Sequence, residues 1–275
     1  MHVRKRYLPP GWYPGAAEQI RNAIERMERS FASATKTGIA GVVPHAGWEF
    51  SGSLALEVLS RISSSMDSMV IIGVHLGPAD GILCAFEDAY ETPLGPIPAD
   101  AELLGEIRGA LPVHEDRHAD NTVEVQLPFV RHLFPEAHLL GMRVSPSADA
   151  ARLGTALAKA AVRLGRRVAV VGSTDLTHYG QSYGFAPAGT GEPALRWVRE
   201  VNDRRFIESL LAMDFDEALS RALRERSACS AGGALAAMRF AQENGVEQGR
   251  LVRYTTSFDV HPAESFVGYA GILYP

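Results

Sequence analysis

The sequence predicts an α/β protein: a single domain over residues 1–275, built on a central mixed or mainly parallel β-sheet that helices flank. Short apolar runs, such as residues 70–74, alternate with longer segments whose apolar residues recur at three- and four-residue steps. This alternation is typical of strands and helices that follow one another along an α/β chain. The sequence contains no internal repeat or linker-like stretch that would divide it, so one domain is expected.

The first half of the chain opens with a rigid, aromatic stretch, residues 9–15, which we expect to lie against the body of the protein. Residues 16–31 are predicted to form a helix, because Ile20, Ile24 and Met27 share one helical face. By the same criteria, the elements that follow are strands at 38–43, 70–74 and 82–86, helices at 53–63 and 100–111, and a turn-rich connection at 90–98.

In the second half, apolar residues recur at helical steps over residues 122–134. Because Pro128 lies inside this run, the helix either kinks there or begins there. Residues 181–193 are rich in glycine, proline, serine and threonine, which predicts a mobile loop. The remaining pattern predicts strands at 138–144, 168–172, 251–257 and 266–273, and helices at 147–164, 195–212, 215–224 and 230–243.

The composition argues against several kinds of partner. The chain is 46% hydrophobic and 21% charged, which is ordinary for a soluble globular protein. A net charge of −5 and a pI near 6.0 argue against nucleic acid or an anionic membrane as the main partner. No apolar run approaches the ~20 residues that span a bilayer, and the basic N-terminus lacks the apolar stretch of a signal peptide. Two cysteines do not make a disulfide scaffold, so a cytoplasmic protein is expected.

Three common catalytic signatures are missing from the sequence. There is no G-x-G-x-x-G after the first predicted strand and no G-x-x-x-x-G-K-[ST], so dinucleotide and P-loop nucleotide binding lack their motifs. The G-x-S-x-G motif is absent as well, which argues against a nucleophile-elbow hydrolase.

A histidine stands directly after the first predicted strand, in the stretch VVPHAGWEFSG at residues 42–52. The carboxyl ends of strands in open α/β sheets are where ligands and catalytic groups collect. His45 is therefore a candidate site residue, and the small residues after it would let the backbone approach a ligand. Taken alone, the motif is equally compatible with a turn histidine that hydrogen-bonds its neighbours.

Comparable residues follow other predicted strands. His75 comes after the run at 70–74, and Asp175 and His178 come after the run at 168–172. Cys229 precedes a helix-like apolar segment. The same pattern is expected if Cys229 is only a small buried residue that packs under that helix. Together these residues suggest a metal site or an acid–base site. Their separations are too long for a local zinc motif, so only the fold can bring them together.

With these residues assembled, the chain resembles the Memo family, also called AmmeMemoRadiSam system protein B, nearly from end to end. The blocks that carry the resemblance include PHAG at 44–47, TPLG at 92–95, EVQLPF at 124–129, STDLTHYG at 173–180 and VGYAGI at 267–272. That family is related in fold to the LigB-type, class III extradiol dioxygenases, which cleave catechols with non-haem iron. The resemblance therefore implies a LigB-like sheet.

The resemblance also implies one divalent transition metal held by His45, His75 and Cys229. Imidazole and thiolate ligands suit iron, copper or zinc better than magnesium or calcium, and the dioxygenase relatives make Fe(II) the first expectation. A third histidine in those relatives acts on the substrate as acid or base. His178 is its counterpart here, and Asp175 would orient it or contribute to the same pocket.

Asn121, Glu124 and Trp48 are the expected substrate-binding residues. Asn121 stands where the family usually has a pocket histidine, and an amide can hydrogen-bond a substrate but cannot transfer protons near pH 7. Glu124 is read equally well as an exposed acid in the first turn of a helix, and packing explains Trp48 nearly as well as a ring-binding pocket. His75 stands one residue earlier than the corresponding family histidine, so its register as a ligand is open.

Three functions follow from these residues. The first is a redox or extradiol-dioxygenase-like enzyme that acts on an unknown small aromatic substrate, with His178 handling protons. The second is a non-catalytic metal- or peptide-binding protein that works with a radical-SAM partner and an AMMECR-type protein, by analogy with the family. A thiolate ligand favours this second function, because thiolates near Fe(II) and O2 oxidise readily. The third is a metal-dependent hydrolase, which no motif supports.

Overall fold

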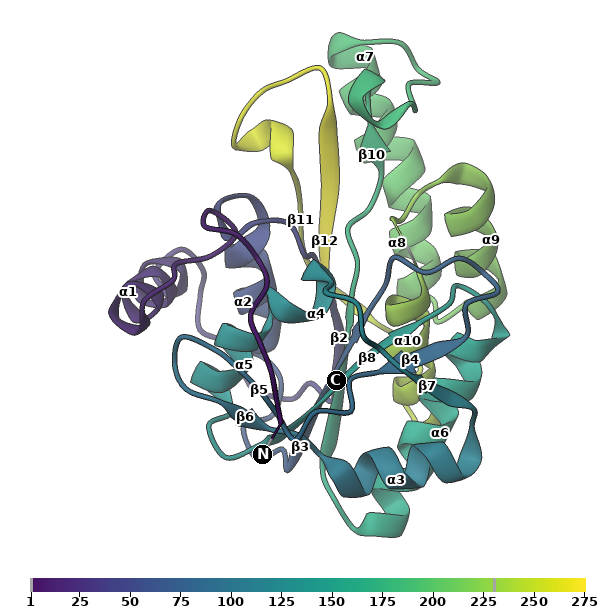
Figure 1. Ribbon diagram of the computed structural model, residues 1–275. Helices are drawn as coiled ribbons and strands as arrows, with labels where there is room; N and C mark the ends of the chain where they lie inside the picture. The colour runs from purple at the N-terminus through teal and green to yellow at the C-terminus, as the bar shows by residue number, and fades with distance from the viewer. Residues whose placement is uncertain (1, 230) are drawn as a thin grey trace.

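A mixed β-sheet runs through the computed structural model, which describes residues 2–229 and 231–275 (Figure 1). Its strands lie in the order β10 (His178–Tyr179), β12 (Phe266–Tyr274), β2 (Ala40–Val43), β9 (Val168–Ser173), β3 (Ser68–Gly73), β8 (His138–Val144), β4 (Ile82–Cys84) and β7 (Val113–Glu115), and β11 (Arg250–Thr256) pairs with β12. The four strands β2, β9, β3 and β8 are parallel. Strands β12 and β4 run antiparallel to their neighbours β2 and β8. The predicted α/β class with a mixed sheet is confirmed.

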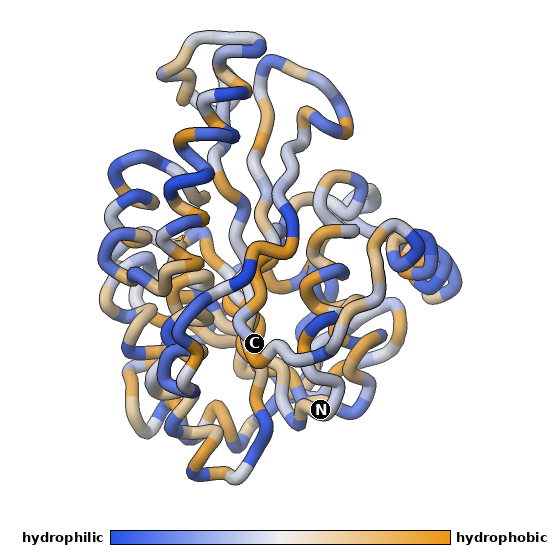
Figure 2. Tube along the Cα trace, turned by 180° about the vertical axis from the view of Figure 1, so that it is seen from behind, coloured by the Kyte–Doolittle hydropathy of each residue, from blue (hydrophilic) through white to orange (hydrophobic). Residues whose placement is uncertain are grey.

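Helices cover both faces of the sheet. One layer contains α1 (Ala17–Glu28), α2 (Ser53–Leu59) and α5 (Leu127–Leu133), and the other contains α3 (Ala101–Ala110), α6 (Ala148–Leu164), α8 (Asp203–Leu211), α9 (Phe215–Glu225) and α10 (Gly232–Glu243). Of two shorter helices, α4 (Asn121–Glu124) lies beside β3, and α7 (Gly191–Trp197) packs against β10 and the first residue of β12. Figure 2 shows apolar residues along the central strands and polar residues on the outer helices.

Strand β3 shows how the two layers share the sheet. Its residues Val70 and Ile72 belong to the apolar cluster beneath α6 and α10, whereas Met69 and Ile71 belong to the cluster beneath α2 and α5. Successive side chains of a strand point to opposite faces, so a strand covered on both sides must be apolar throughout. This is why the central strands appear in the sequence as continuous apolar runs.

Several boundaries differ from the sequence-based expectation. Helix α5 begins at Leu127 with Pro128 in its first turn, so the proline begins a helix and does not kink one. The connection expected at residues 90–98 contains two-residue strands of a separate sheet, formed by β1 (Val3–Arg4), β5 (Ala89–Tyr90) and β6 (Ile97–Pro98). Helix α10, predicted from residue 230, begins at Gly232; residue 230 lies outside the described residues.

Helix α10 packs unusually close to the sheet, because glycine meets glycine at the contact. A Cβ added to Gly233 would lie 2.3 Å from the carbonyl oxygen of Ile72 in β3. A Cβ added to Gly172 in β9 would lie 2.3 Å from the carbonyl oxygen of Gly233. The start of α10 therefore rests on the last residues of β3 and β9.

No helix within residues 2–229 and 231–275 combines the length and the apolar composition that crossing a membrane requires.

Candidate metal centre

Three predicted site residues stand at equivalent places on neighbouring strands. His45, His75 and Asp175 each lie two residues beyond the last residue of β2, β3 and β9, respectively. These strands are parallel, and β9 lies between the other two. Because parallel strands end at the same edge of the sheet, the three side chains converge there. The close packing of α10 brings Cys229, three residues before this helix, to the same edge.

The ligand atoms of His45, His75 and Cys229 lie within 4.8 Å of one another. The Cys229 sulfur is 3.3 Å from Nε2 of His45, and the two imidazole rings are 5.3 Å apart, centroid to centroid. The backbone N–H of Cys229 donates to the carbonyl oxygen of Asp175 at 3.1 Å, which ties the cysteine to the end of β9. Two imidazoles and a thiolate form a donor set that fits iron, copper or zinc.

His75 reaches this group through an uncommon backbone conformation. Its φ is 62°, in the left-handed region that few residues other than glycine adopt. The Nδ1 atom of its ring lies 2.9 Å from Oδ2 of Asp120, which leaves Nε2 for a ligand. The backbone N–H of Val74 donates to the hydroxyl of Thr122 at 3.1 Å, so both backbone and ring are held by the start of α4. His75 is thus in the ligand group despite its earlier position in the sequence.

Without a metal, the three side chains form a thiolate between two protonated imidazole rings. Burial alone would raise the pKa of the Cys229 thiol, but the positive charge of His45 and hydrogen bonds from the surrounding rings hold it well below its usual range. Burial would lower the pKa of His45, but Asp175 and the Cys229 thiolate raise it to about 9. The hydrogen bond to Asp120 is the main reason that the pKa of His75 rises to about 10. A metal would replace the protons on these rings.

Asp175 and His178 lie beside the ligand group. Oδ1 of Asp175 accepts the backbone N–H of His45 at 2.7 Å, and its Oδ2 lies 3.8 Å from Nε2 of His45 and 3.9 Å from Nε2 of His178. Burial raises the pKa of the Asp175 carboxyl. Nε2 of His178 is buried and has no hydrogen-bond partner among the described residues. This nitrogen is available to a bound molecule.

A cavity of about 670 Å³ opens over the two histidine ligands. Its wall includes the predicted residues His45, His75, Asn121, Asp175 and His178, together with the aromatic residues Trp12, Phe50, Tyr183 and Tyr269 and the exposed His261. A second cavity of about 480 Å³ reaches the ligand group from the side of Cys229 and shares His75, His178 and Tyr183 with the first. The candidate centre is therefore accessible from two sides.

Two predicted substrate-binding residues lie elsewhere. Trp48 is buried in the core, stacked on Phe129 at 4.0 Å, and its Nε1 donates to the carbonyl oxygen of Val125 at 3.1 Å. Glu124 accepts hydrogen bonds from the backbone N–H groups of Tyr7 and Leu8 and from the hydroxyl of Tyr13. Neither residue lines the cavity over the ligands, because both hold the N-terminal part of the chain and α5 in place.

Sequence reasoning missed Asp120, Trp12 and Tyr269. Asp120 had a detectable signal, because its side chain caps α4 by accepting the N–H of Thr122, a common use of aspartate before a helix. Its contact with His75 joins residues 45 positions apart, which no local pattern shows. Asn121 does line the cavity, and its Nδ2 donates to the carbonyl oxygen of His45 at 3.2 Å.

A family model described as "Memo-like protein" matches residues 5–273. The chain belongs to the Memo-like family. Among curated relatives, a MEMO1 family protein of Thermococcus onnurineus is 31% identical over 294 residues, covering 99% of each chain. A second MEMO1 family protein, from Thermococcus kodakarensis, is 32% identical over 290 residues, covering 95% of this chain and 98% of the relative. The family predicted from the sequence blocks is therefore confirmed.

The fold of this Memo-like chain also resembles a solved structure. It matches the crystal structure of an uncharacterized protein, JW3007, from Escherichia coli K12, with a TM-score of 0.53. The match covers 87% of this chain and 100% of that protein at 12% sequence identity, so it supports a similar fold and nothing about function.

Proposed function

We propose that this Memo-like protein binds one divalent transition metal through His45, His75 and Cys229 and uses it for redox, dioxygenase-like chemistry on a small aromatic compound. The observation that carries the proposal is the convergence of the three ligand atoms within 4.8 Å beside a cavity with aromatic walls. Fe(II) is the first candidate, with copper or zinc as alternatives, since all three suit imidazole and thiolate donors. Iron or copper would supply redox chemistry there, and zinc only Lewis acidity.

The cavity suits a flat ring. Trp12, Phe50 and Tyr269 contribute aromatic surface to its wall, and aromatic side chains bind rings by stacking and edge contacts. The volume of about 670 Å³ lies within the range of pockets that enclose small molecules. Around that surface a few polar groups converge, which is the usual composition of a substrate site.

His178 is the residue we assign to proton transfer. Its buried Nε2 lacks a hydrogen-bond partner among the described residues, so it can hold or accept a proton at a hydroxyl of the bound compound. Oδ2 of Asp175, 3.9 Å from this nitrogen, would help to orient the ring. Asn121 can hydrogen-bond the compound but cannot transfer a proton to it or from it.

The experiment is anaerobic purification followed by elemental analysis of the wild type, His45→Ala and Cys229→Ser. Cys84→Ser and His138→Ala are matched controls, because Cys84 is buried in β4 and His138 is exposed at the start of β8. We expect about one metal per chain in the wild type and both controls, and little in the two site variants. A loaded protein should then consume O2 with some member of a catechol series.

Two outcomes would contradict parts of this proposal. Metal that is bound but supports no O2 uptake with any catechol would favour the non-catalytic metal-binding function. No metal in any preparation, even after reconstitution with Fe(II), copper and zinc, would favour a protein that binds peptides or partners through the cavity.

A further inference from the structure

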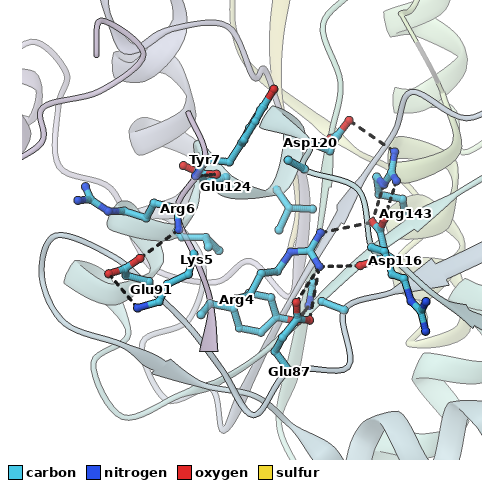
Figure 3. A pocket seen from close by; sticks show the side chains of 17 residues that line it. Arg4, Lys5, Arg6, Tyr7, Glu87, Glu91, Asp116, Asp120, Glu124 and Arg143 are labelled. Atoms are coloured by element: carbon cyan, nitrogen blue, oxygen red, sulfur yellow. Dashed lines mark hydrogen bonds and ion pairs between the residues drawn. The ribbon is translucent and has the colours of Figure 1, made fainter. Parts of the chain in front are cut away.

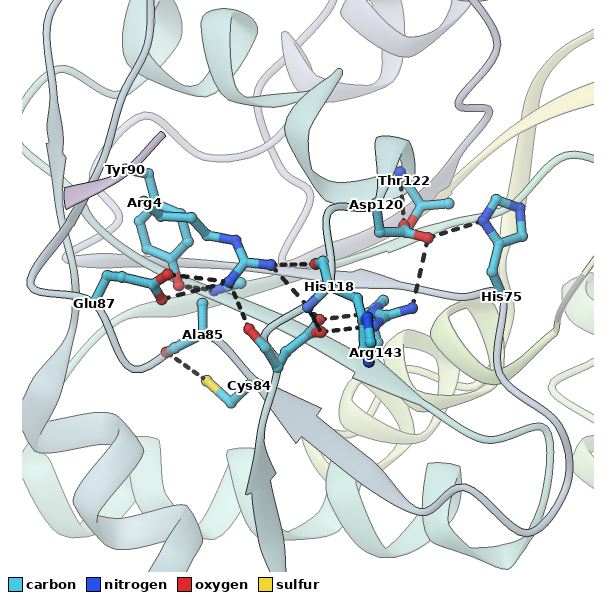
Figure 4. A network of polar contacts seen from close by, with 12 residues as sticks. Arg4, His75, Cys84, Ala85, Glu87, Tyr90, His118, Asp120, Thr122 and Arg143 are labelled. Carbon is cyan, nitrogen blue, oxygen red and sulfur yellow. Dashed lines mark hydrogen bonds and ion pairs between the residues drawn. The ribbon is translucent and has the colours of Figure 1, made fainter. Parts of the chain in front are cut away.

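A buried chain of charged contacts leads away from the candidate ligand His75 (Figure 4). Oδ2 of Asp120, which faces Nδ1 of His75, also lies 3.6 Å from Nη1 of Arg143. Arg143 in turn donates from Nε and Nη2 to the two oxygens of Asp116, each at 2.7 Å. The side chains of Asp116, Asp120 and Arg143 are at most 9% exposed, so solvent screens these contacts little.

Asp120 is held firmly at the centre of this chain. Its Oδ1 accepts the backbone N–H of Thr122 at 2.9 Å and also the Thr122 hydroxyl, and its Oδ2 lies between His75 and Arg143. Both oxygens are therefore occupied, and the carboxylate plane has little freedom to turn. Since Asp120 meets Nδ1 of His75, its orientation decides where the imidazole ring lies.

The outer end of the chain is the N-terminal segment. Arg4, in β1, donates from Nη1 to the carbonyl oxygen of Asp116 at 2.7 Å and from Nη2 to that of His118 at 2.6 Å. Its guanidinium also contacts Glu87 at 3.3 Å. A cavity of about 200 Å³ separates the N-terminal segment from Asp120 and Arg143, and Figure 3 shows Arg4 reaching across its wall to Asp116.

We propose that Arg143 is a positioning residue for the metal ligand His75, acting through Asp120, and that Arg4 ties this arrangement to the N-terminal segment. The inference rests on the metal site proposed above. A histidine that binds a metal through Nε2 must keep its proton on Nδ1, and a carboxylate acceptor fixes both that tautomer and the ring orientation. Arg143 holds the carboxylate in the place that this task requires.

The left-handed backbone makes His75 depend on this support. A φ of 62° is an uncommon conformation for a residue with a side chain, and it persists only where the surroundings determine it. The ring is 40% exposed, so packing constrains it less than it constrains the 3%-exposed His45. The contact with Asp120 is therefore the main restraint on the ring of His75 that the described residues provide.

The test compares Arg143→Gln, Arg143→Lys and Arg4→Gln with the wild type in two measurements. The first is the dissociation constant for Co2+, followed by the sulfur-to-cobalt absorption band. Changes to the direct partners of a metal ligand typically weaken metal binding about 10- to 100-fold; because Arg143 acts through Asp120, we expect a loss of about 10-fold for Arg143→Gln. Arg143→Lys keeps a cation without the two-pronged contact to Asp116, so a smaller loss is expected, and Arg4→Gln should weaken binding about 3-fold or more.

The second measurement is the NMR signal of the proton on Nδ1 of His75 in the metal-free protein. In the wild type, the hydrogen bond to Asp120 should protect this proton from exchange with solvent, whereas in Arg143→Gln the proton should exchange faster. A role in fold stability alone would leave this exchange rate unchanged. Arg166→Gln is the matched control, since Arg166 binds both oxygens of the buried Asp100 at 2.7 and 2.9 Å without contacting Asp120 or His75.

Wild-type Co2+ affinity and a wild-type His75 spectrum in Arg143→Gln would overturn the inference. Equal losses in Arg166→Gln would also overturn it, because they would show a general effect of removing an arginine that binds a buried aspartate. If Arg143→Gln does not fold, Arg143→Lys and Arg4→Gln decide by the same two measurements. Failure of the wild type to bind Co2+ would refute the proposed metal site, and the exchange of the Nδ1 proton of His75 would still test the positioning role.

Discussion

The sulfur of Cys229 lies 3.3 Å from Nε2 of His45, although 184 positions separate the two residues in the sequence. The contact depends on two features of the fold. His45 follows the end of β2, and Cys229 is brought to that edge by the glycine-mediated packing of α10 on β3 and β9. Because the ring of His45 is next to the sulfur, the thiol is held as a thiolate and the imidazole as its cationic partner.

The two cysteines should differ sharply in reactivity. Cys229 is half-buried, with a lowered pKa, whereas burial raises the pKa of Cys84 far above its usual range. The thiolate is the reactive form, so iodoacetamide at pH 7 should modify Cys229 and leave Cys84 unmodified in the folded, metal-free protein. Mass spectrometry of peptides measures both sites. Added Zn2+ should protect Cys229, and labelling unaffected by any metal would contradict the ligand assignment.

Gly233→Ala should disturb the metal centre without touching a ligand. The added methyl group would meet the carbonyl oxygen of Ile72 at 2.3 Å, which forces α10 away from the sheet. We expect a loss of about 1–3 kcal/mol in the free energy of unfolding, as overpacking usually causes, and weaker binding of Co2+. Gly105→Ala in α3 is the control, since nothing lies within 4 Å of its new Cβ and alanine favours helices. Equal Co2+ affinity in both variants would show that the packing of α10 does not set the position of Cys229.

Glu124→Gln should loosen the N-terminal segment and leave metal binding intact. The carboxylate accepts three hydrogen bonds, from Tyr7, Leu8 and Tyr13, at 2.8 to 3.0 Å. Hydrogen bonds to a charged group contribute about 1.5–3 kcal/mol, so the free energy of unfolding should fall by an amount in this range. Hydrogen–deuterium exchange should speed up at residues 2–9. The same substitution at the exposed Glu18 should change neither the free energy of unfolding nor the exchange rate. A change in the substrate affinity of Glu124→Gln would instead support the substrate-binding role predicted for Glu124.

Asp203 should make stability fall as the pH rises. Burial raises the pKa of this carboxyl to about 7 despite hydrogen bonds from Thr177 and Tyr254, whereas an unfolded aspartate titrates near 3.9. Between these values the folded protein binds a proton that the unfolded chain has lost, so the contribution of Asp203 to stability is complete below about pH 4 and declines up to about pH 7. Asp203→Asn cannot lose a proton and should be free of this decline.

Urea unfolding of the wild type and Asp203→Asn at several pH values measures the effect. The difference between their free energies of unfolding should change by about 1.4 kcal/mol for each unit of pKa shift as the pH crosses this window. The exposed Asp216→Asn is the control and should follow the wild type. A difference that stays constant from pH 4 to pH 7 would show that Asp203 is ionised throughout.

The strands and the strand-end residues were predictable because they depend on local pattern. A continuous apolar run marks a strand buried on both faces, and β3 and β9 are such runs. The two-residue strands β1, β5 and β6 were not predicted, since so short an element carries no periodicity. The sequence likewise leaves a cavity role and a packing role open for Trp48, because its neighbours line the cavity while its own side chain faces Phe129 in the core.

The residues that hold the ring of His75 in place were the least predictable part of the candidate site. Asp120 and Arg143 act on His75 across long sequence separations, and their role depends on which strand lies beside β3. The register of His75 was open for a similar reason. Its left-handed backbone is imposed by contacts with the start of α4, and the residues next to it in the sequence do not indicate this conformation.

Strand β2, which His45 follows, is paired on one side with β12, and β12 ends at residue 274. A ribosome adds about 5–20 residues each second, so the histidine emerges many seconds before the strand that flanks it and before the cysteine it faces. The nascent chain thus has an incomplete set of donors until Cys229 is made, and its sheet is incomplete until β12 is made. On the assignment proposed above, the ion would be bound after translation, by a finished fold.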